Sequence, residues 1–163
     1  RRGSPGSLDV IANSPCLNSL LETLERSRDG LVRLCDTEME ALRILNLVPL
    51  VPLDIGIKEL PQEGGLTEDA VSFTKGCYLG QEVMSRLHSM GAVRRSLRLT
   101  QSSEPVAFGT EVFADGKKIG LVKSSIKFCN SYFALVLLSI TVSNESSILV
   151  RDSAKGQALT VVA

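Results

Sequence analysis

The spacing of apolar residues along the chain changes from a helical period to a strand-like period near Gly91. Before that point, apolar residues recur three and four positions apart, as they do on one face of a helix. This spacing predicts three helices. They are a helix that starts at Ser14-Pro15 and carries Leu17, Leu20, Leu21 and Leu24, a helix through "MEALRIL" at 39–45, and a helix through "QEVMSRLHSM" at 81–90.

Local signals predict where these helices begin and end. Ser14 is the expected N-cap of the first helix, because serine is a preferred cap and proline suits the position after it. Thr37 and Glu40 have the spacing of a capping box for the second helix, which must end before Pro49. Between these two helices, "GLVRLC" at 30–35 alternates well enough to predict a short strand.

After Gly91, apolar and polar residues alternate, which is the pattern of half-buried strands. Asp115-Gly116 lies between two such runs and is a strong signal for a tight hairpin. The strand-like runs are "RRSLRLT" at 94–100, "TEVFADGKKIGLV" at 110–122, "YFALVLLSITV" at 132–142, "SSILVR" at 146–151 and "ALTVVA" at 158–163. So many strands in so short a segment predict a small closed or partly closed antiparallel β-barrel.

These patterns together predict an α+β fold, in which a helix/strand layer is followed by a small β-barrel. Residues 1–13 are expected to form a disordered tail, residues 14–91 an α+β domain and residues 92–163 the barrel domain. A chain of 163 residues is long enough to bury a core without disulfides or metals.

Composition narrows the classes of partner. The chain has 18 Lys plus Arg residues and 18 Asp plus Glu residues, so it has no bulk positive charge with which to bind nucleic acid directly. A local basic patch is left open. The longest apolar run, at 132–142, is too short to cross a membrane as a helix, and we expect no membrane partner.

The four cysteines do not have the spacing of a metal site, and His88 is the only histidine. We therefore expect no metal ligands and a reducing compartment. Cys16, Cys35 and Cys129 are interpreted as small apolar residues that fill gaps in the core.

The remaining cysteine, Cys77, lies in "FTKGCYLGQE" at 73–82, just before the third predicted helix. Glycines at 76 and 80 make this backbone permissive and let another molecule approach it closely. Lys75 and the positive end of the helix would favour the thiolate form, whereas burial would oppose it. The sequence leaves open whether Cys77 is a functional thiol or a small buried side chain at a domain junction.

The run Lys75-Gly76-Cys77-Tyr78, one variable residue, then Gly80-Gln81-Glu82 resembles the signature of the YgfZ-type folate-binding proteins. These proteins are relatives of the glycine-cleavage aminomethyltransferase, or T-protein. The resemblance extends to "LRI" at 42–44, "LPQEGGL" at 60–66, "AVSF" at 70–73, Arg86, and the pair Arg94-Arg95.

The chain also departs from that family in two ways. It has Asn46-Leu47-Val48-Pro49 where family members usually have a glycine before the proline. It is also about half the length of a family member, so we expect the N-terminal part of the shared folate channel to be missing. Residues 14–91 would then be a partial folate-binding domain, within the C-terminal part of a T-protein-like fold.

The resemblance implies a tetrahydrofolate-binding accessory protein that supports iron–sulfur cluster assembly or repair in client enzymes, including enzymes that modify tRNA. The implied cofactor is tetrahydrofolate or a one-carbon derivative, and the implied partners are iron–sulfur clients or assembly proteins. The implied compartment is the cytoplasm of a bacterium, or the interior of a mitochondrion or plastid in a eukaryote.

The site residues follow from the chemistry of a folate, which has a pterin with amide-like donors and a carboxylated glutamyl tail. Glu82 is a candidate acceptor for pterin donors, with Glu63 ranked below it, and Tyr78 is a candidate for stacking. The other cofactor-binding candidates are Lys75, Gln81, Arg86, Arg94 and Arg95. Cys77 is the candidate functional thiol.

Each candidate also has a simpler reading. Arg86 is read as a solvated helix residue, Arg94-Arg95 as the exposed start of a strand, Glu63 as a loop charge, and His88 as a surface or domain-boundary residue. Two other functions are kept open: an aminomethyltransferase-like one-carbon transferase, and a structural fragment without activity.

Overall fold

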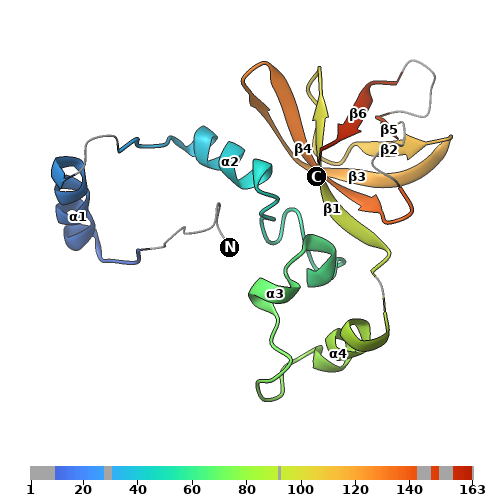
Figure 1. Ribbon diagram of the computed structural model, residues 1–163, viewed down its shortest axis with the longest axis horizontal. Coiled ribbons are helices and arrows are strands. Elements are labelled where there is room, and N and C mark those ends of the chain that lie inside the picture. The colour runs from blue at the N-terminus through green and yellow to red at the C-terminus, as the bar shows by residue number, and fades with distance from the viewer. Residues whose placement is uncertain (1–9, 28–30, 92, 143–147, 151–155, 163) are drawn as a thin grey trace.

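A closed β-barrel forms the C-terminal part of the chain, and in the described residues that precede it there are four α-helices (Figure 1). The computed structural model describes residues 10–27, 31–91, 93–142, 148–150 and 156–162. The tail expected at 1–13 therefore lies mostly outside the described residues. Residues 10–13 precede the first helix and are exposed.

The barrel strands pair in the order β1-β4-β3-β2-β5-β6 and close where β6 pairs with β1. All pairings are antiparallel, so the predicted α+β fold with a small antiparallel barrel is confirmed. The strand bounds are β1 Arg95–Ser102, β2 Glu111–Ala114, β3 Lys117–Phe128, β4 Ser131–Ser139, β5 Ile148–Leu149 and β6 Ala158–Val161.

The hairpin between β2 and β3 turns at Asp115-Gly116, as the sequence predicts. Both residues have positive φ, 51° and 72°. Two consecutive positive φ angles are typical of the type I′ turn, whose twist matches that of the strands it joins. This dipeptide therefore sets the pairing of β2 with β3 locally.

The long apolar run of β4 is explained by burial on both faces of the strand. Its Ala134, Val136 and Leu138 pack into the barrel interior, whereas Leu135 and Leu137 pack on the outer face with Ile44 of α2 (Asp36–Leu45). Each fully buried aliphatic side chain contributes about 1.5–3 kcal/mol by leaving water. The two core clusters thus share β4, and α2 is held against the barrel through it.

An ion-pair network also fastens α2 and the segment that follows it, residues 49–66, to the barrel; we call this segment the connection. Arg43 Nη1 lies 2.6 Å from Asp54 Oδ2 and donates to Val48 O, and Arg43 Nη2 donates to Ser124 Oγ on β3 at 2.9 Å. Asp54 is fully buried. The connection makes several turns and contains the 3₁₀ helix η1 (Pro61–Gly64).

Helix α1 (Ser14–Ser27) stands apart from the barrel in Figure 1. Its predicted apolar stripe is present, but Leu17, Leu21 and Leu24 are exposed. Glu22 and Arg26 form an exposed ion pair across one turn of this helix, with the closest atoms 3.5 Å apart.

Three local predictions are wrong. The N-cap of α1 is Asn13, whose Oδ1 accepts from Cys16 N, rather than Ser14. The capping box of α2 uses Cys35 and Glu38 rather than Thr37 and Glu40, and Cys35 N donates to Glu38 Oε2 at 2.7 Å. Of the strand predicted at 30–35, residues 31–35 are described, and they form no strand because no partner strand lies beside them.

Candidate functional site

The cysteine loop, which we define as residues 71–80, leads into helix α4 (Gln81–Met90), and the predicted helix is confirmed. Gly80 is the N-cap and has φ of 84°, a conformation that strains any residue with a Cβ. The loop is tied to the helix by Phe73, whose ring stacks on His88 with centroids 4.1 Å apart. Figure 1 shows α3 (Thr67–Ala70) and α4 on the same side of the barrel.

Cys77 is exposed on this loop. The reading of Cys77 as a small buried residue is therefore wrong, and its thiol is accessible to another molecule. The Nζ atom of Lys75 lies 5.0 Å from the centroid of the Tyr78 ring, within reach of a cation–π interaction. Among the ion pairs formed by described residues, none involves Lys75.

A pocket of about 580 Å³ opens beside the loop, and we call it the cysteine-loop pocket. Sites for small ligands typically have about 300–1,000 Å³ and mostly apolar walls with a few polar groups. The walls come from four segments: the connection with η1, the end of α3, the cysteine loop, and the start of α4. They include Leu60, Pro61, Lys75, Tyr78, Val83 and Met84.

Tyr78, a residue of the pocket wall, has a buried hydroxyl without a hydrogen-bond partner among the described residues. Gln62 Oε1 is in the same state, and its Nε2 bonds only weakly to the sulfur of Met84, another wall residue, at 3.5 Å. Leaving a buried polar group unpaired costs about 1–3 kcal/mol. A ligand that reaches the Tyr78 hydroxyl and pairs with it would recover that energy.

The remaining candidates on α4 lie outside the pocket wall. Glu82 and Arg86 pair with each other across one helical turn, 3.0 Å apart, and both are well exposed. Gln81 is half-buried at the start of the helix. Arg86 therefore lies in solvent on the helix surface, as its simpler reading states.

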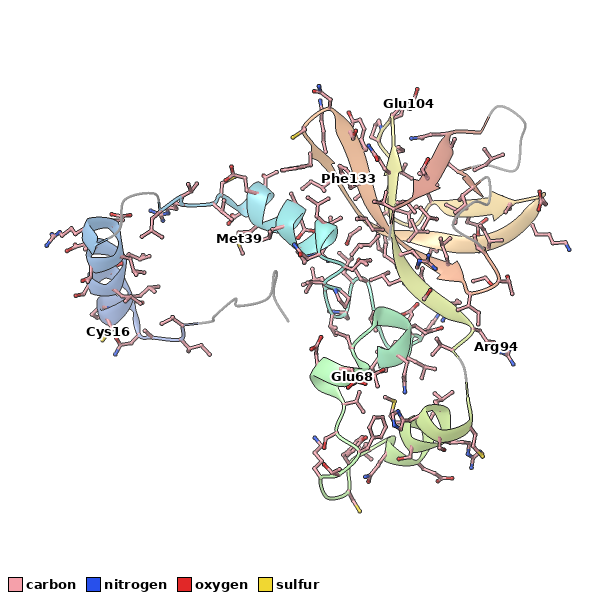
Figure 2. The ribbon with its side chains drawn as sticks, in the orientation of Figure 1. Cys16, Met39, Glu68, Arg94, Glu104 and Phe133 are labelled. Atoms are coloured by element: carbon pink, nitrogen blue, oxygen red, sulfur yellow. The ribbon has the colours of Figure 1, made fainter. Side chains whose placement is uncertain are left out.

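The two arginines at the start of the barrel lie in different environments. Arg94 is exposed at the junction between α4 and β1 (Figure 2). Arg95 forms two hydrogen bonds with Glu63 of η1, from Nε at 2.8 Å and from Nη2 at 3.0 Å. Glu63, read as a loop charge, is instead buried, and it holds η1 against β1.

A second hollow of about 350 Å³ lies on the side of the barrel, and we call it the barrel-side pocket. Arg95, Lys118, Lys123 and Glu59 line it, and Glu59 also lines the cysteine-loop pocket. Lys123 Nζ donates to Glu59 Oε1 at 3.0 Å. Burial raises the pKa of Glu59, but hydrogen bonds from Lys123 and from Gly56 N outweigh it and lower the pKa overall.

Sequence patterns miss Glu59, Gln62 and Lys123. Glu59 and Lys123 are 64 positions apart, so no local spacing predicts their contact. The other three cysteines, Cys16, Cys35 and Cys129, are exposed, as Cys77 is. The interpretation of these three as core residues is therefore wrong. Figure 2 shows Cys16 on α1, well away from the barrel.

The described residues lack two features that would indicate a class of site. They contain no group of three or more His, Cys, Asp and Glu side chains placed to hold a metal ion. None of their helices has the length and apolar character needed to cross a bilayer.

Comparison with known proteins identifies relatives of this chain, although no protein-family profile matches it. The tRNA-modifying protein YgfZ of Edwardsiella ictaluri is 31% identical over 136 residues, covering 77% of this chain and 40% of that protein. YgfZ of Sodalis glossinidius is 29% identical over 144 residues, covering 83% of this chain and 44% of that protein.

A human relative, the mitochondrial iron–sulfur cluster assembly factor IBA57, is 38% identical over 68 residues, covering 37% of this chain and 19% of that protein. The matches thus span less than half the length of each of these relatives. Their agreement in sequence, together with the helical segment followed by a barrel, assigns the chain to a family: it belongs to the YgfZ- and IBA57-type proteins, within the T-protein-like fold.

Proposed function

We propose that this chain is part of a tetrahydrofolate-binding accessory protein that supports iron–sulfur clusters in client enzymes, among them enzymes that modify tRNA. The names of the relatives support both parts of this role. YgfZ is called a tRNA-modifying protein, and IBA57 is called an iron–sulfur cluster assembly factor. The observation that carries the proposal is structural. An exposed thiol, Cys77, lies on a loop whose neighbouring residues line a ligand-sized pocket.

The cysteine-loop pocket fits a folate in volume and in lining. Its apolar walls suit the flat rings, and the Tyr78 hydroxyl is a buried group in need of a hydrogen-bond partner, which a pterin offers. Lys75 at the pocket would pair with the first glutamyl carboxylate of the ligand. Bound tetrahydrofolate supplies a carrier for one-carbon units.

Of the expected cofactor-binding residues, Lys75 and Tyr78 line the pocket, whereas Gln81, Glu82, Arg86, Arg94 and Arg95 do not. Glu82 and Arg86 bind each other on the surface of α4, so the carboxylate in the pocket wall is Glu59. Because the pKa of Glu59 is lowered, this carboxylate is charged at neutral pH and can accept hydrogen bonds. We therefore assign to Glu59 the acceptor role first expected of Glu82.

We assign Cys77 to the contact with the client. Iron–sulfur clusters normally take four protein ligands, so a single thiol on this loop would act together with groups of the partner. Its exposure on a loop beside the proposed folate pocket places it where a partner can reach it. The compartment proposed is the cytoplasm in a bacterium, or the interior of a mitochondrion or plastid in a eukaryote.

Titration calorimetry of the full chain with tetrahydrofolate tests the pocket. The wild-type chain should bind saturably, and Tyr78→Phe should weaken binding by about tenfold, the effect of one lost hydrogen bond of about 1.4 kcal/mol. Tyr132→Phe is the matched control, because Tyr132 on β4 also lies under a lysine, Lys127, but away from the pocket. Absence of binding by the wild-type chain would refute the folate assignment.

A complementation assay tests the thiol. In cells that lack their own family member, Cys77→Ala should abolish support of an iron–sulfur tRNA-modifying enzyme, whereas Cys129→Ala, an equally exposed cysteine on the barrel, should keep it. Full support by Cys77→Ala would end the proposed role. Turnover of an aminomethylated carrier protein by the purified chain would instead favour the transferase alternative.

A further inference from the structure

Phe73 and His88 form a stacked pair of rings that joins the start of the cysteine loop to the last turn of α4. The ring centroids are 4.1 Å apart, and the ring planes are inclined by 22°. His88 is exposed, but one face of its ring lies on Phe73. Stacked aromatic rings attract each other beyond the effect of the area that they bury. This contact therefore holds the beginning of the loop on the helix.

The end of the loop is held at the opposite end of α4. Gly80 is the N-cap of the helix, and its carbonyl oxygen accepts from Met84 N at 3.1 Å. His88 follows Gly80 by eight positions, which corresponds to about 12 Å along the axis of an α-helix. The loop is thus attached to α4 at two separate points, and the helix between them acts as a rigid support.

Contacts inside the loop place Cys77 at its bend. The Nζ atom of Lys75 lies 5.0 Å from the centroid of the Tyr78 ring, so residues on either side of Cys77 face each other. Before the bend, Lys75 N donates to Ser72 Oγ at 3.2 Å. After it, Gln81 N donates to Tyr78 O, also at 3.2 Å. The chain between α3 and α4 forms a projecting turn in Figure 1, and the exposed thiol belongs to this turn.

The contacts inside the loop move with it and do not fix its direction relative to α4. Among the hydrogen bonds, ion pairs and ring contacts that the described residues form, the Phe73–His88 stack is the one that joins a loop side chain to this helix. We propose that His88 is a positioning residue, which fixes the direction in which the loop presents the thiol of Cys77. The role depends on a flat ring at position 88 and not on a charge there.

The position of the loop also affects the cysteine-loop pocket, because Lys75 and Tyr78 of the loop line it. A loop that is fixed before binding loses less conformational entropy when a ligand or partner arrives, so binding is tighter. The stack thus prepares both the thiol and one wall of the pocket. This inference rests on the proposed function for the tasks of the thiol and the pocket. The position of the loop itself is measurable without folate and without a client.

Electron paramagnetic resonance of a nitroxide label on Cys77 measures the mobility of the loop. The parent chain for this test carries Cys16→Ser, Cys35→Ser and Cys129→Ser, which remove the other exposed thiols. His88→Ala should shorten the rotational correlation time of the label by about twofold or more, because a loop without its anchor samples more conformations. His88→Phe keeps a flat ring and should give the spectrum of the parent.

Phe73→Leu removes the other ring of the pair and should mobilise the label as His88→Ala does. Because the two rings act through each other, the double variant should be no more mobile than either single variant. Phe73 lies outside α4, so Phe73→Leu decides the question even where His88→Ala disturbs the helix. Met90→Ala is the matched control. Met90 lies in the same last turn of α4 and is 80% exposed, so its variant should leave the spectrum unchanged.

Two further measurements, on chains that keep all four cysteines, connect the loop to the proposed function. In titration calorimetry with tetrahydrofolate, His88→Ala should weaken binding by about two- to tenfold, the effect of losing one aromatic pair. In the complementation assay, His88→Ala should lower support of the client enzyme. His88→Phe should restore both, which a role of His88 as a charge or as a hydrogen-bonding group would not allow.

The outcomes separate this inference from the proposed function. A label that stays as immobile in His88→Ala and Phe73→Leu as in the parent would overturn the positioning role. So would a His88→Phe spectrum as mobile as that of His88→Ala, or equal mobility in Met90→Ala. Unchanged folate binding and client support in His88→Ala, despite a mobile label, would show that the stack has no part in function and would refute the inference. The expected spectra, together with no folate binding by the wild-type chain, would refute the folate assignment and support the positioning of Cys77 by His88.

Discussion

Arg43 and Asp54 form an ion pair across the interface between α2 and the connection, with Arg43 Nη1 2.6 Å from Asp54 Oδ2. Asp54 is fully buried, and its Oδ2 also accepts from Leu50 N at 2.8 Å. Its Oδ1 accepts from the hydroxyl of Ser124 on β3. One carboxylate thus binds the helix, the connection and the barrel, and it sets where the segment leading to the cysteine loop begins.

Breaking this pair should destabilise the fold strongly. Arg43→Met leaves the Asp54 carboxylate buried without its cation, so we expect the free energy of unfolding to fall by about 3–5 kcal/mol. Urea denaturation followed by circular dichroism measures the change. Arg26→Met is the control, because the Glu22–Arg26 pair is exposed and should contribute less than about 0.5 kcal/mol. A small loss in Arg43→Met, similar to that of the control, would show that the network does not hold the connection.

The pair between Glu59 and Lys123 should make stability depend on pH. The pKa of Glu59 is lower in the folded chain than its ordinary value of 4.5, so its contribution is present above that value and is lost as the pH falls through the folded pKa. Glu59→Gln should therefore be less stable than wild type at pH 7, and the difference should shrink below about pH 4.5. Urea denaturation of both proteins from pH 7 to pH 3 checks this. A difference that stays constant over the range would contradict the assignment.

The two glycines of the cysteine loop should respond differently to alanine. Gly80 has φ of 84°, so Gly80→Ala should cost about 1–2 kcal/mol at the start of α4. At Gly76 an added Cβ would meet no atom within 4 Å and φ is not in the left-handed region, so Gly76→Ala should change stability by less than about 0.5 kcal/mol. Thermal unfolding of the two variants, followed side by side, decides the point. Equal destabilisation would show that the loop backbone differs from the one described.

Packing of α2 on the barrel should be sensitive to loss of volume at Ile44. This side chain is fully buried between α2 and β4, so Ile44→Ala should lower the free energy of unfolding by about 2–5 kcal/mol. Leu79→Ala, which removes an exposed side chain from the cysteine loop, should have almost no effect on stability. Chemical denaturation measures both changes. If the two variants lose the same free energy of unfolding, the result would argue against this core cluster.

Much of the local structure follows from short stretches of sequence. The hairpin at Asp115-Gly116, the end of α2 before Pro49 and the span of α4 all appear where the residues predict them, because turn preferences and helical periodicity act within a few positions. The capping box shows the limit of this reasoning. The box forms at Cys35 and Glu38 rather than at Thr37 and Glu40, because α2 begins at Asp36, one residue before Thr37.

The candidate site was predicted only in part. Lys75 and Tyr78 do line a pocket, as a motif read from neighbouring residues can indicate. The same motif did not show that Glu82 would pair with Arg86, nor that Glu63 would be buried against Arg95. A salt bridge depends on which side chains approach in space, and Glu63 and Arg95 are 32 positions apart.

By itself, the sequence determined the helical first half, the barrel strands and the permissive loop around Cys77, since each depends on the chemistry of adjacent residues. Only the tertiary structure decided which carboxylates are buried, which cations they bind, and that Glu59 forms a wall common to two pockets. The reason is physical. Periodicity and turn preference act along the chain, whereas burial and ion pairing depend on segments that meet only after the barrel has closed.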